Sequence, residues 1–274
     1  MNNFLKRTLS GALFVALIIG SILLSQASFF VVFAIINGWA VYEFHQITNL
    51  QTNVSVNKWA AVGAAILLFS CSYIYKSGLI PFPVYWIYGA YIMLVFIAEL
   101  FYQKENPIHN WAYLLLGQAY IALPFSLLIH ITFIQNFQPL ILLAVFGSIW
   151  VNDTGAYLIG VSLGKHRLFE RISPKKSWEG FFGGAFFALI SGYVFSIFIP
   201  QLSLLNWLLF SEIIVVFGTL GDLTESMLKR TLKVKDSGDV IPGHGGLLDR
   251  FDSMLFAAPA IYIFLDLISN HLKN

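Results

Sequence analysis

Charged side chains gather in one window of the sequence, between residues 219 and 253. The chain has 16 Lys and Arg and 14 Asp and Glu residues, and eleven of these lie in that window, with apolar sequence on both sides. The eleven are Asp222, Glu225, Lys229, Arg230, Lys233, Lys235, Asp236, Asp239, Asp249, Arg250 and Asp252. Because charged groups are costly in sequence that belongs in lipid, so dense a cluster is typical of a functional site.

A polar helix face makes up the first part of this window. Five polar residues follow spacings of three and four, which place side chains on one face of a helix. They are Asp222, Glu225, Ser226, Lys229 and Arg230. A glycine-rich loop follows, in which Gly243, Gly245 and Gly246 surround His244. Backbone N–H groups that converge without Cβ obstruction are suited to binding a phosphate group, although such a loop alone is a weak signal.

Two acidic residues come directly after the glycine-rich loop. Asp249 and Asp252 are three positions apart, so we expect them to share a face in the first turn of the next helix. Carboxylates beside a phosphate repel it unless a cation lies between them, and Mg²⁺ bound by one or two carboxylates is the usual solution. The sequence therefore predicts metal-assisted phosphoryl or nucleotidyl transfer, with Asp222 and Asp249 as the metal ligands.

Two earlier segments are candidates for the same site. In the segment 173–177, Ser173 and Pro174 resemble a helix cap and first helical position, so we expect Lys175, Lys176 and Ser177 to form a phosphate site at a helix N-terminus. Taken alone, these basic residues would also fit a topology signal that contacts lipid headgroups. Asn152 and Asp153 lie in the middle of an apolar run. They are expected either to line the site or to form a structural bond between helices.

The rest of the chain predicts an all-α, polytopic membrane protein. Its residues are 58% hydrophobic, with 26 Phe and a mean hydropathy of +0.75. Apolar runs of about 20 residues are long enough to cross a bilayer as helices. About nine spans are expected, at 8–25, 28–47, 58–75, 83–101, 111–131, 138–161, 181–199, 204–227 and 250–270. Glu43 and Glu99, near the ends of spans two and four, are expected to be interfacial and solvated.

The basic residues predict the orientation of these spans. With a cytoplasmic N-terminus, fourteen of the 16 Lys and Arg residues fall on the cytoplasmic side, as the positive-inside rule requires. Two long connections, at 162–180 and 228–249, then also lie in the cytoplasm. We expect one integral-membrane domain over 1–274, in which 1–135 is a helical scaffold and 136–274 is the catalytic part.

Three motifs of this chain resemble those of the phosphatidate cytidylyltransferases, also called CDP-diacylglycerol synthases. The most specific combines SMLKR at 226–230, KD at 235–236 and PGHGGLLDRFD at 242–252. SPKKSWEG at 173–180 and NDTGAY at 152–157 are similar to that family's upstream motifs and occur in the same order. The resemblance covers about 150–255, while length and hydropathy agree over the whole chain.

The resemblance implies that CTP and phosphatidate react to CDP-diacylglycerol and pyrophosphate, with Mg²⁺ as cofactor; whether a second cation takes part stays open. It implies an enzyme of the cell (cytoplasmic) membrane with its site on the cytoplasmic side and no nucleic-acid partner. Catalytic roles are expected for Asp222, Asp249, Lys229, Arg230 and Arg250. Substrate binding is expected of Ser173, Lys175, Lys176, Ser177, Gly243, His244, Gly245, Gly246, Asn152 and Asp153.

Other functions remain as alternatives. A CTP-dependent lipid-alcohol kinase has related motifs but would transfer the terminal phosphoryl group and release CDP instead of pyrophosphate. A polytopic transporter also places charges in the membrane, but it has no need of a charged, glycine-rich cytoplasmic loop. Small residues such as Gly183, Gly184 and Gly192 fit packing in a homodimer as well as packing within one chain.

Overall fold

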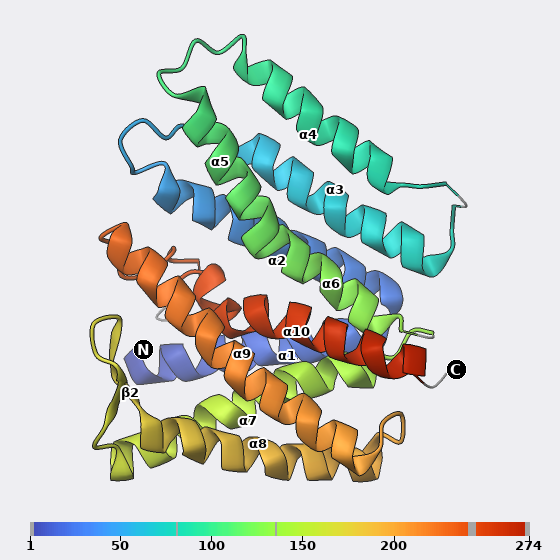
Figure 1. Cartoon of the computed structure of the whole chain (residues 1–274), viewed down its shortest axis with the longest axis vertical. Coiled ribbons are helices and arrows are strands. Elements are labelled where there is room, and N and C mark those ends of the chain that lie inside the picture. The colour runs from blue at the N-terminus through green and yellow to red at the C-terminus, as the bar shows by residue number, and fades with distance from the viewer. Residues whose placement is uncertain (1–2, 81, 135, 241–244, 272–274) are drawn as a thin grey trace. The chain divides into compact units, whose positions relative to one another are not determined.

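The computed structural model describes residues 3–80, 82–134, 136–240 and 245–271 and shows a chain built almost entirely of helices (Figure 1). It divides into two compact units, which are described separately. The first unit comprises Met1–Phe133 and Thr231–Phe251, and the second comprises Ile134–Arg230 and Asp252–Asn274. The window 231–251 lies within the predicted catalytic part of the chain and belongs to the same unit as the N-terminal helices.

The first unit has a core rich in phenylalanine. Its elements are α1 (Asn3–Leu24), α2 (Gln26–Thr48), α3 (Lys58–Ser77), α4 (Tyr85–Glu99), α5 (Pro107–Gly117), the π-helical turn η1 (Gln118–Ala122), α6 (Leu123–Thr132) and the 3₁₀ turn η2 (Leu248–Arg250). Ser25 caps α2 in a capping box, and Gly78 ends α3 in the left-handed conformation that glycine adopts readily. The ring of Phe251 packs against Phe33 and Phe125, so the end of the 231–251 window is fixed in this core.

The second unit consists of four long helices and a short hairpin. Its elements are α7 (Pro139–Leu163), strands β1 (Arg167–Phe169) and β2 (Ser173–Ser177), α8 (Trp178–Phe198), α9 (Leu204–Thr231, of which Thr231 falls in the first unit) and α10 (Asp252–His271). The two strands pair antiparallel, with Arg167 opposite Ser177. This hairpin connects α7 to α8, which run side by side (Figure 1).

The prediction of a polytopic all-α membrane protein is confirmed. Within the described residues, seven helices are long and apolar enough to cross a membrane, counting α5, η1 and α6 as one span at Pro107–Thr132. Two shorter apolar helices, Thr8–Leu24 and Tyr85–Glu99, match the remaining two of the nine expected spans. The side of the membrane on which the N-terminus lies stays a prediction.

Glycines let α7 and α8 approach closely. A Cβ atom at Gly183 would lie 2.5 Å from the Cβ of Ile159, and one at Gly155 would lie 2.7 Å from Cδ2 of Phe187. These distances are shorter than any van der Waals contact, so a larger residue would force the two helices apart. Gly183 therefore serves contact within the second unit, which is one of the two kinds of packing that its sequence context fits.

We predict that Gly183→Ala destabilises the protein by about 1–3 kcal/mol, because it overpacks the α7–α8 contact. Gly89→Ala is the matched control: it also adds one methyl group within a helix, but no described atom lies within 4 Å of the added Cβ. Thermal unfolding in detergent should show a lower melting temperature for the Gly183 variant and an unchanged or slightly higher one for the Gly89 variant. Equal melting temperatures would contradict the assigned packing.

The structure corrects the expected helix start at Ser173. Residues 173–177 form strand β2, and α8 begins only at Trp178, with Ser177 as its N-cap. The Oγ atom of Ser177 accepts a hydrogen bond from the N–H of Gly180 at 3.1 Å. The backbone of this segment forms hydrogen bonds with strand β1 rather than within a helix. Lys175 and Lys176 therefore precede α8 and do not lie in its first turn.

Candidate functional site

A cavity of about 270 Å³ lies within the second unit, among α7, β2, α8, α9 and α10. Many of the residues that line it were predicted to bind substrate or metal from the sequence alone. They are Asn152, Asp153, Lys175, Lys176, Ser177 and Asp222. The structure therefore brings together residues from three sequence motifs that are separated by up to 70 positions.

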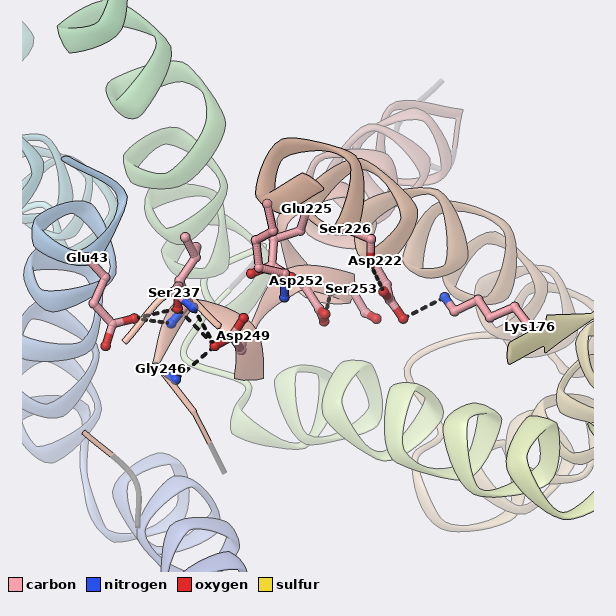
Figure 2. Close-up of polar contacts among 12 residues, drawn as sticks. Glu43, Lys176, Asp222, Glu225, Ser226, Ser237, Gly246, Asp249, Asp252 and Ser253 are labelled. Atoms are coloured by element: carbon pink, nitrogen blue, oxygen red, sulfur yellow. Dashed lines mark hydrogen bonds and ion pairs between the residues drawn. The ribbon is translucent and has the colours of Figure 1, made fainter. Parts of the chain in front are cut away.

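An ion pair links two of these motifs. The Nζ atom of Lys176 lies 2.5 Å from Oδ2 of Asp222, with 28% and 30% of the two side chains exposed (Figure 2). The hydroxyl of Ser226, one turn further along α9, donates to Oδ1 of Asp222 at 3.2 Å. Both oxygens of this carboxylate are thus engaged, and Lys176 is positioned at the cavity by the opposite charge.

Three carboxylates interact in the second unit. Asp222 repels both Asp153 and Asp252, while Lys176 attracts both of them. The close approach of α9 and α10 explains part of this arrangement, because a Cβ at Gly221 would lie 2.5 Å from the carbonyl oxygen of Asp252. Residue 221 must therefore be glycine for α9 and α10 to approach so closely. This approach brings Asp222 of α9 near Asp252 of α10.

Asp249 occupies a different environment, in the first unit. It lies in the 3₁₀ turn η2, and α10 begins at Asp252, so the expectation that both share the first turn of a helix is wrong. The Oδ2 atom of Asp249 accepts hydrogen bonds from the N–H of Gly246 at 2.8 Å, the N–H of Ser237 at 2.9 Å and the hydroxyl of Ser237 at 3.1 Å (Figure 2). We call residues 232–240 and 245–250 the Asp249 loop.

Glycine is required beside Asp249. Gly245 has a φ of +82°, in the left-handed region, and a Cβ there would lie 2.8 Å from Oδ2 of Asp249. Gly246 supplies one of the three donors to that oxygen. These two glycines of the predicted phosphate loop thus shape the surroundings of the carboxylate. Gly243 and His244, predicted to contact phosphate, lie outside the described residues.

The remaining predicted residues do not line the cavity. Lys229 forms an ion pair at 2.7 Å with the buried Glu225, one turn before it on α9. Arg230 and Arg250 are exposed, while Ser173 is partly buried at the start of β2. Two opposite charges on the polar face of α9, those of Lys229 and Glu225, therefore neutralise each other.

Comparison with known proteins identifies the family. The model of the cytidylyltransferase family matches residues 5–268, which is nearly the whole chain. The chain belongs to the cytidylyltransferase family. A phosphatidate cytidylyltransferase from Bacillus subtilis is 39% identical over 180 residues, which cover 65% of this chain and 66% of that protein. Enzymes of the same name from Staphylococcus epidermidis and Staphylococcus aureus are 48% and 47% identical over 126 residues, which cover 45% of this chain and 48% of each relative.

The alignments with these relatives are partial. They span just under two thirds of the Bacillus protein and about half of the Staphylococcus proteins. Family membership of this cytidylyltransferase chain thus rests on the family model, which covers all the motifs from Asn152 to Asp252.

The donor set of the cytidylyltransferase chain fits a hard divalent cation. Among the described residues, no group of three or more His, Cys, Asp and Glu side chains is placed to hold a metal ion by itself. Magnesium sites often use only one or two carboxylates, and substrate phosphates complete the coordination. Asp153, Asp222 and Asp252 interact with one another and with Lys176, and carboxylate oxygens are the ligands that Mg²⁺ prefers.

The sequence predictions gave too little weight to three acidic residues. Asp252, which is not among the residues predicted to bind metal or substrate, interacts with the carboxylates of Asp222 and Asp153 in the second unit. Glu43, expected to be solvated, is only 1% exposed and accepts hydrogen bonds from the Asp249 loop. Glu99, also expected to be solvated, is 9% exposed and bonded to Asn110 and Lys104. A carboxylate inside an apolar run was the available signal, since such a group needs partners wherever it is buried.

Proposed function

We propose that this protein transfers the cytidylyl group of CTP to phosphatidate, releasing pyrophosphate and forming CDP-diacylglycerol. The observation that carries the proposal is the cavity in the second unit, where Lys175, Lys176 and Asp222 meet Asn152 and Asp153 in a chain of the cytidylyltransferase family. The names of the relatives support the choice of phosphatidate as the acceptor. Helices long enough to cross a membrane suit a substrate that resides in lipid.

The proposed reaction needs no nucleophilic side chain. A phosphate oxygen of phosphatidate attacks the α-phosphorus of CTP; the new P–O bond forms as the bond to the β-phosphate oxygen breaks, and pyrophosphate leaves. Catalysis then consists of orienting two polyanions and offsetting their charge. Lysines at the cavity are suited to this, because the ammonium groups of Lys175 and Lys176 attract phosphate oxygens.

Mg²⁺ is proposed as the cofactor; its ligation by both Asp222, of the second unit, and Asp249, of the first, stays a prediction from the sequence. When bound, it would neutralise phosphate charge and polarise the reacting phosphoryl group. Asp222 shares its cavity with Lys176, and Asp249 accepts hydrogen bonds from Ser237 and Gly246 in its loop. We further propose that the N-terminus and the two long connections lie in the cytoplasm, where CTP is available. Formation of a homodimer stays a prediction.

One assay separates the proposed reaction from the kinase alternative. Purified protein is incubated in detergent with Mg²⁺, phosphatidate and CTP labelled at the α-phosphorus. We expect the label in a lipid product and one equivalent of unlabelled pyrophosphate released. A lipid-alcohol kinase would leave the label in CDP and place no α-phosphorus in lipid. Label found only in CDP, with diacylglycerol or another lipid alcohol as acceptor, would overturn the proposal.

A further inference from the structure

A buried carboxylate from α2 holds the Asp249 loop. Glu43 is 1% exposed, and its carboxylate accepts three hydrogen bonds, each of 2.9 Å. Oε2 accepts from the hydroxyl of Ser237 (Figure 2). Oε1 accepts from the N–H of Leu247, and Oε2 also accepts from the N–H of Leu248. All of these residues belong to the first unit. Burying a carboxylate is costly unless it is hydrogen-bonded, and these three donors meet that need.

Ser237 connects Glu43 directly to Asp249. Its hydroxyl lies 2.9 Å from Oε2 of Glu43 and 3.1 Å from Oδ2 of Asp249, and its backbone N–H donates to the same Asp249 oxygen. A hydroxyl has one proton, so it is shared between two carboxylate acceptors. Displacing Glu43 would therefore change the position of Ser237, and with it two of the three hydrogen bonds to Oδ2 of Asp249.

Two glycines independently show that the loop is shaped around Glu43. A Cβ at Gly238 would lie 2.6 Å from Oε1 of Glu43. One at Gly246 would lie 2.5 Å from Oε2 of Glu43 and would also overlap the hydroxyl of Ser237. Gly246 itself donates to Asp249. The loop thus passes so close to this carboxylate that only glycine fits at two of its positions.

We infer that Glu43 is a positioning residue for the reaction: it fixes the backbone of Ser237, Leu247 and Leu248 and thereby the direction of the Asp249 carboxylate. The inference rests on the proposed function, in which Asp249 is a predicted metal ligand. Glu43 acts through the loop and does not touch substrate. Groups that orient a ligand in this way typically change activity by 10–100-fold when altered.

Glu43→Gln tests the inference with little change in shape. Glutamine offers one acceptor oxygen and one NH₂ group, so the N–H of Leu247 or Leu248 loses its partner. We expect kcat to fall about 10–100-fold, while KM for CTP and for phosphatidate changes less than about threefold. Glu99→Gln is the matched control, because Glu99 is another buried carboxylate of the first unit, bonded to Asn110 and Lys104 rather than to the Asp249 loop. Its kcat per folded molecule should stay within about twofold of wild type.

Two further measurements separate positioning from general stability. Ser237→Ala should lower kcat by itself, and the loss in the Glu43→Gln/Ser237→Ala double variant should be smaller than the product of the two single losses, because both changes disrupt the contact between Glu43 and the Ser237 hydroxyl. Hydrogen exchange of the amides of Ser237, Leu247 and Leu248 should be faster in Glu43→Gln and unchanged in Glu99→Gln. A Glu43→Gln enzyme with wild-type kcat, losses that multiply in the double variant, or an equal loss in Glu99→Gln would each overturn the inference. A wild-type protein that forms no CDP-diacylglycerol would instead overturn the proposed function on which it rests.

Discussion

Asp249→Asn should lower turnover at least about 100-fold. The amide oxygen of asparagine can replace Oδ2 as acceptor for Ser237 and Gly246, so the Asp249 loop keeps its shape. The negative charge is lost, and with it the proposed affinity of this carboxylate for a divalent cation, which would stabilise the developing phosphate charge. Steady-state formation of CDP-diacylglycerol from labelled CTP, at saturating Mg²⁺, measures this loss.

The control for this variant is Asp239→Asn, which removes a negative charge from an exposed position of the same loop. Its activity should stay within about twofold of wild type, because a charge exposed to solvent is screened. Both proteins should show wild-type melting temperatures in detergent. Retention of more than a few per cent of wild-type turnover by Asp249→Asn would show that Asp249 is not a ligand on which the reaction depends.

Asp222→Asn should have an effect of similar size, for a different reason. Asp222 forms the ion pair with Lys176 at the cavity and lies near the carboxylates of Asp153 and Asp252. Its replacement reduces the negative charge that would attract a cation and also releases Lys176. We expect kcat to fall at least about 100-fold and the Mg²⁺ concentration for half-maximal activity to rise. A Mg²⁺ titration of initial rates measures both effects.

A double variant distinguishes this role from simple charge neutralisation. If Asp222 served only to pair with Lys176, then Lys176→Met/Asp222→Asn would remove both charges and restore activity. We expect the double variant to be at least as inactive as Asp222→Asn, because the proposed function gives the two residues different partners, a cation for Asp222 and a phosphate for Lys176. Asp266→Asn, which changes an exposed carboxylate of α10 in the same unit, should leave turnover unchanged. Recovery in the double variant would argue against a catalytic role of Asp222.

The membrane-spanning helices were predictable because their signal is local. An apolar run of about 20 residues identifies a span without any knowledge of its neighbours. Boundaries also agree closely, as at α3, expected at 58–75 and found at Lys58–Ser77. The same locality explains the error at Ser173, where serine followed by proline indicates a helix cap. In the structure this segment pairs with β1 as a strand and does not begin a helix. Strand β1 has only three residues, which is too short for an alternating pattern to be recognised in the sequence.

The site was predictable in its residue types but only partly in its grouping. The spacing of polar residues on α9 indicated Asp222, and the two lysines at 175–176 indicated an anion site. The structure places Asp222 and both lysines around one cavity. The approach of Asp252 to Asp222 depends on how α9 and α10 pack at Gly221, which no pattern within one helix reveals. Glu43 was missed for the same reason, since its hydrogen-bond partners are 194–205 residues away in the sequence.

That separation has a consequence for biosynthesis. Ribosomes add about 5–20 residues per second, so the donors from Ser237, Leu247 and Leu248 emerge roughly 10–40 seconds after α2. Glu43 thus enters the membrane with its helix long before the loop that it binds exists. The hydrogen bonds between Glu43 and the Asp249 loop can therefore form only after Leu248 has been translated, long after α2 has been synthesised.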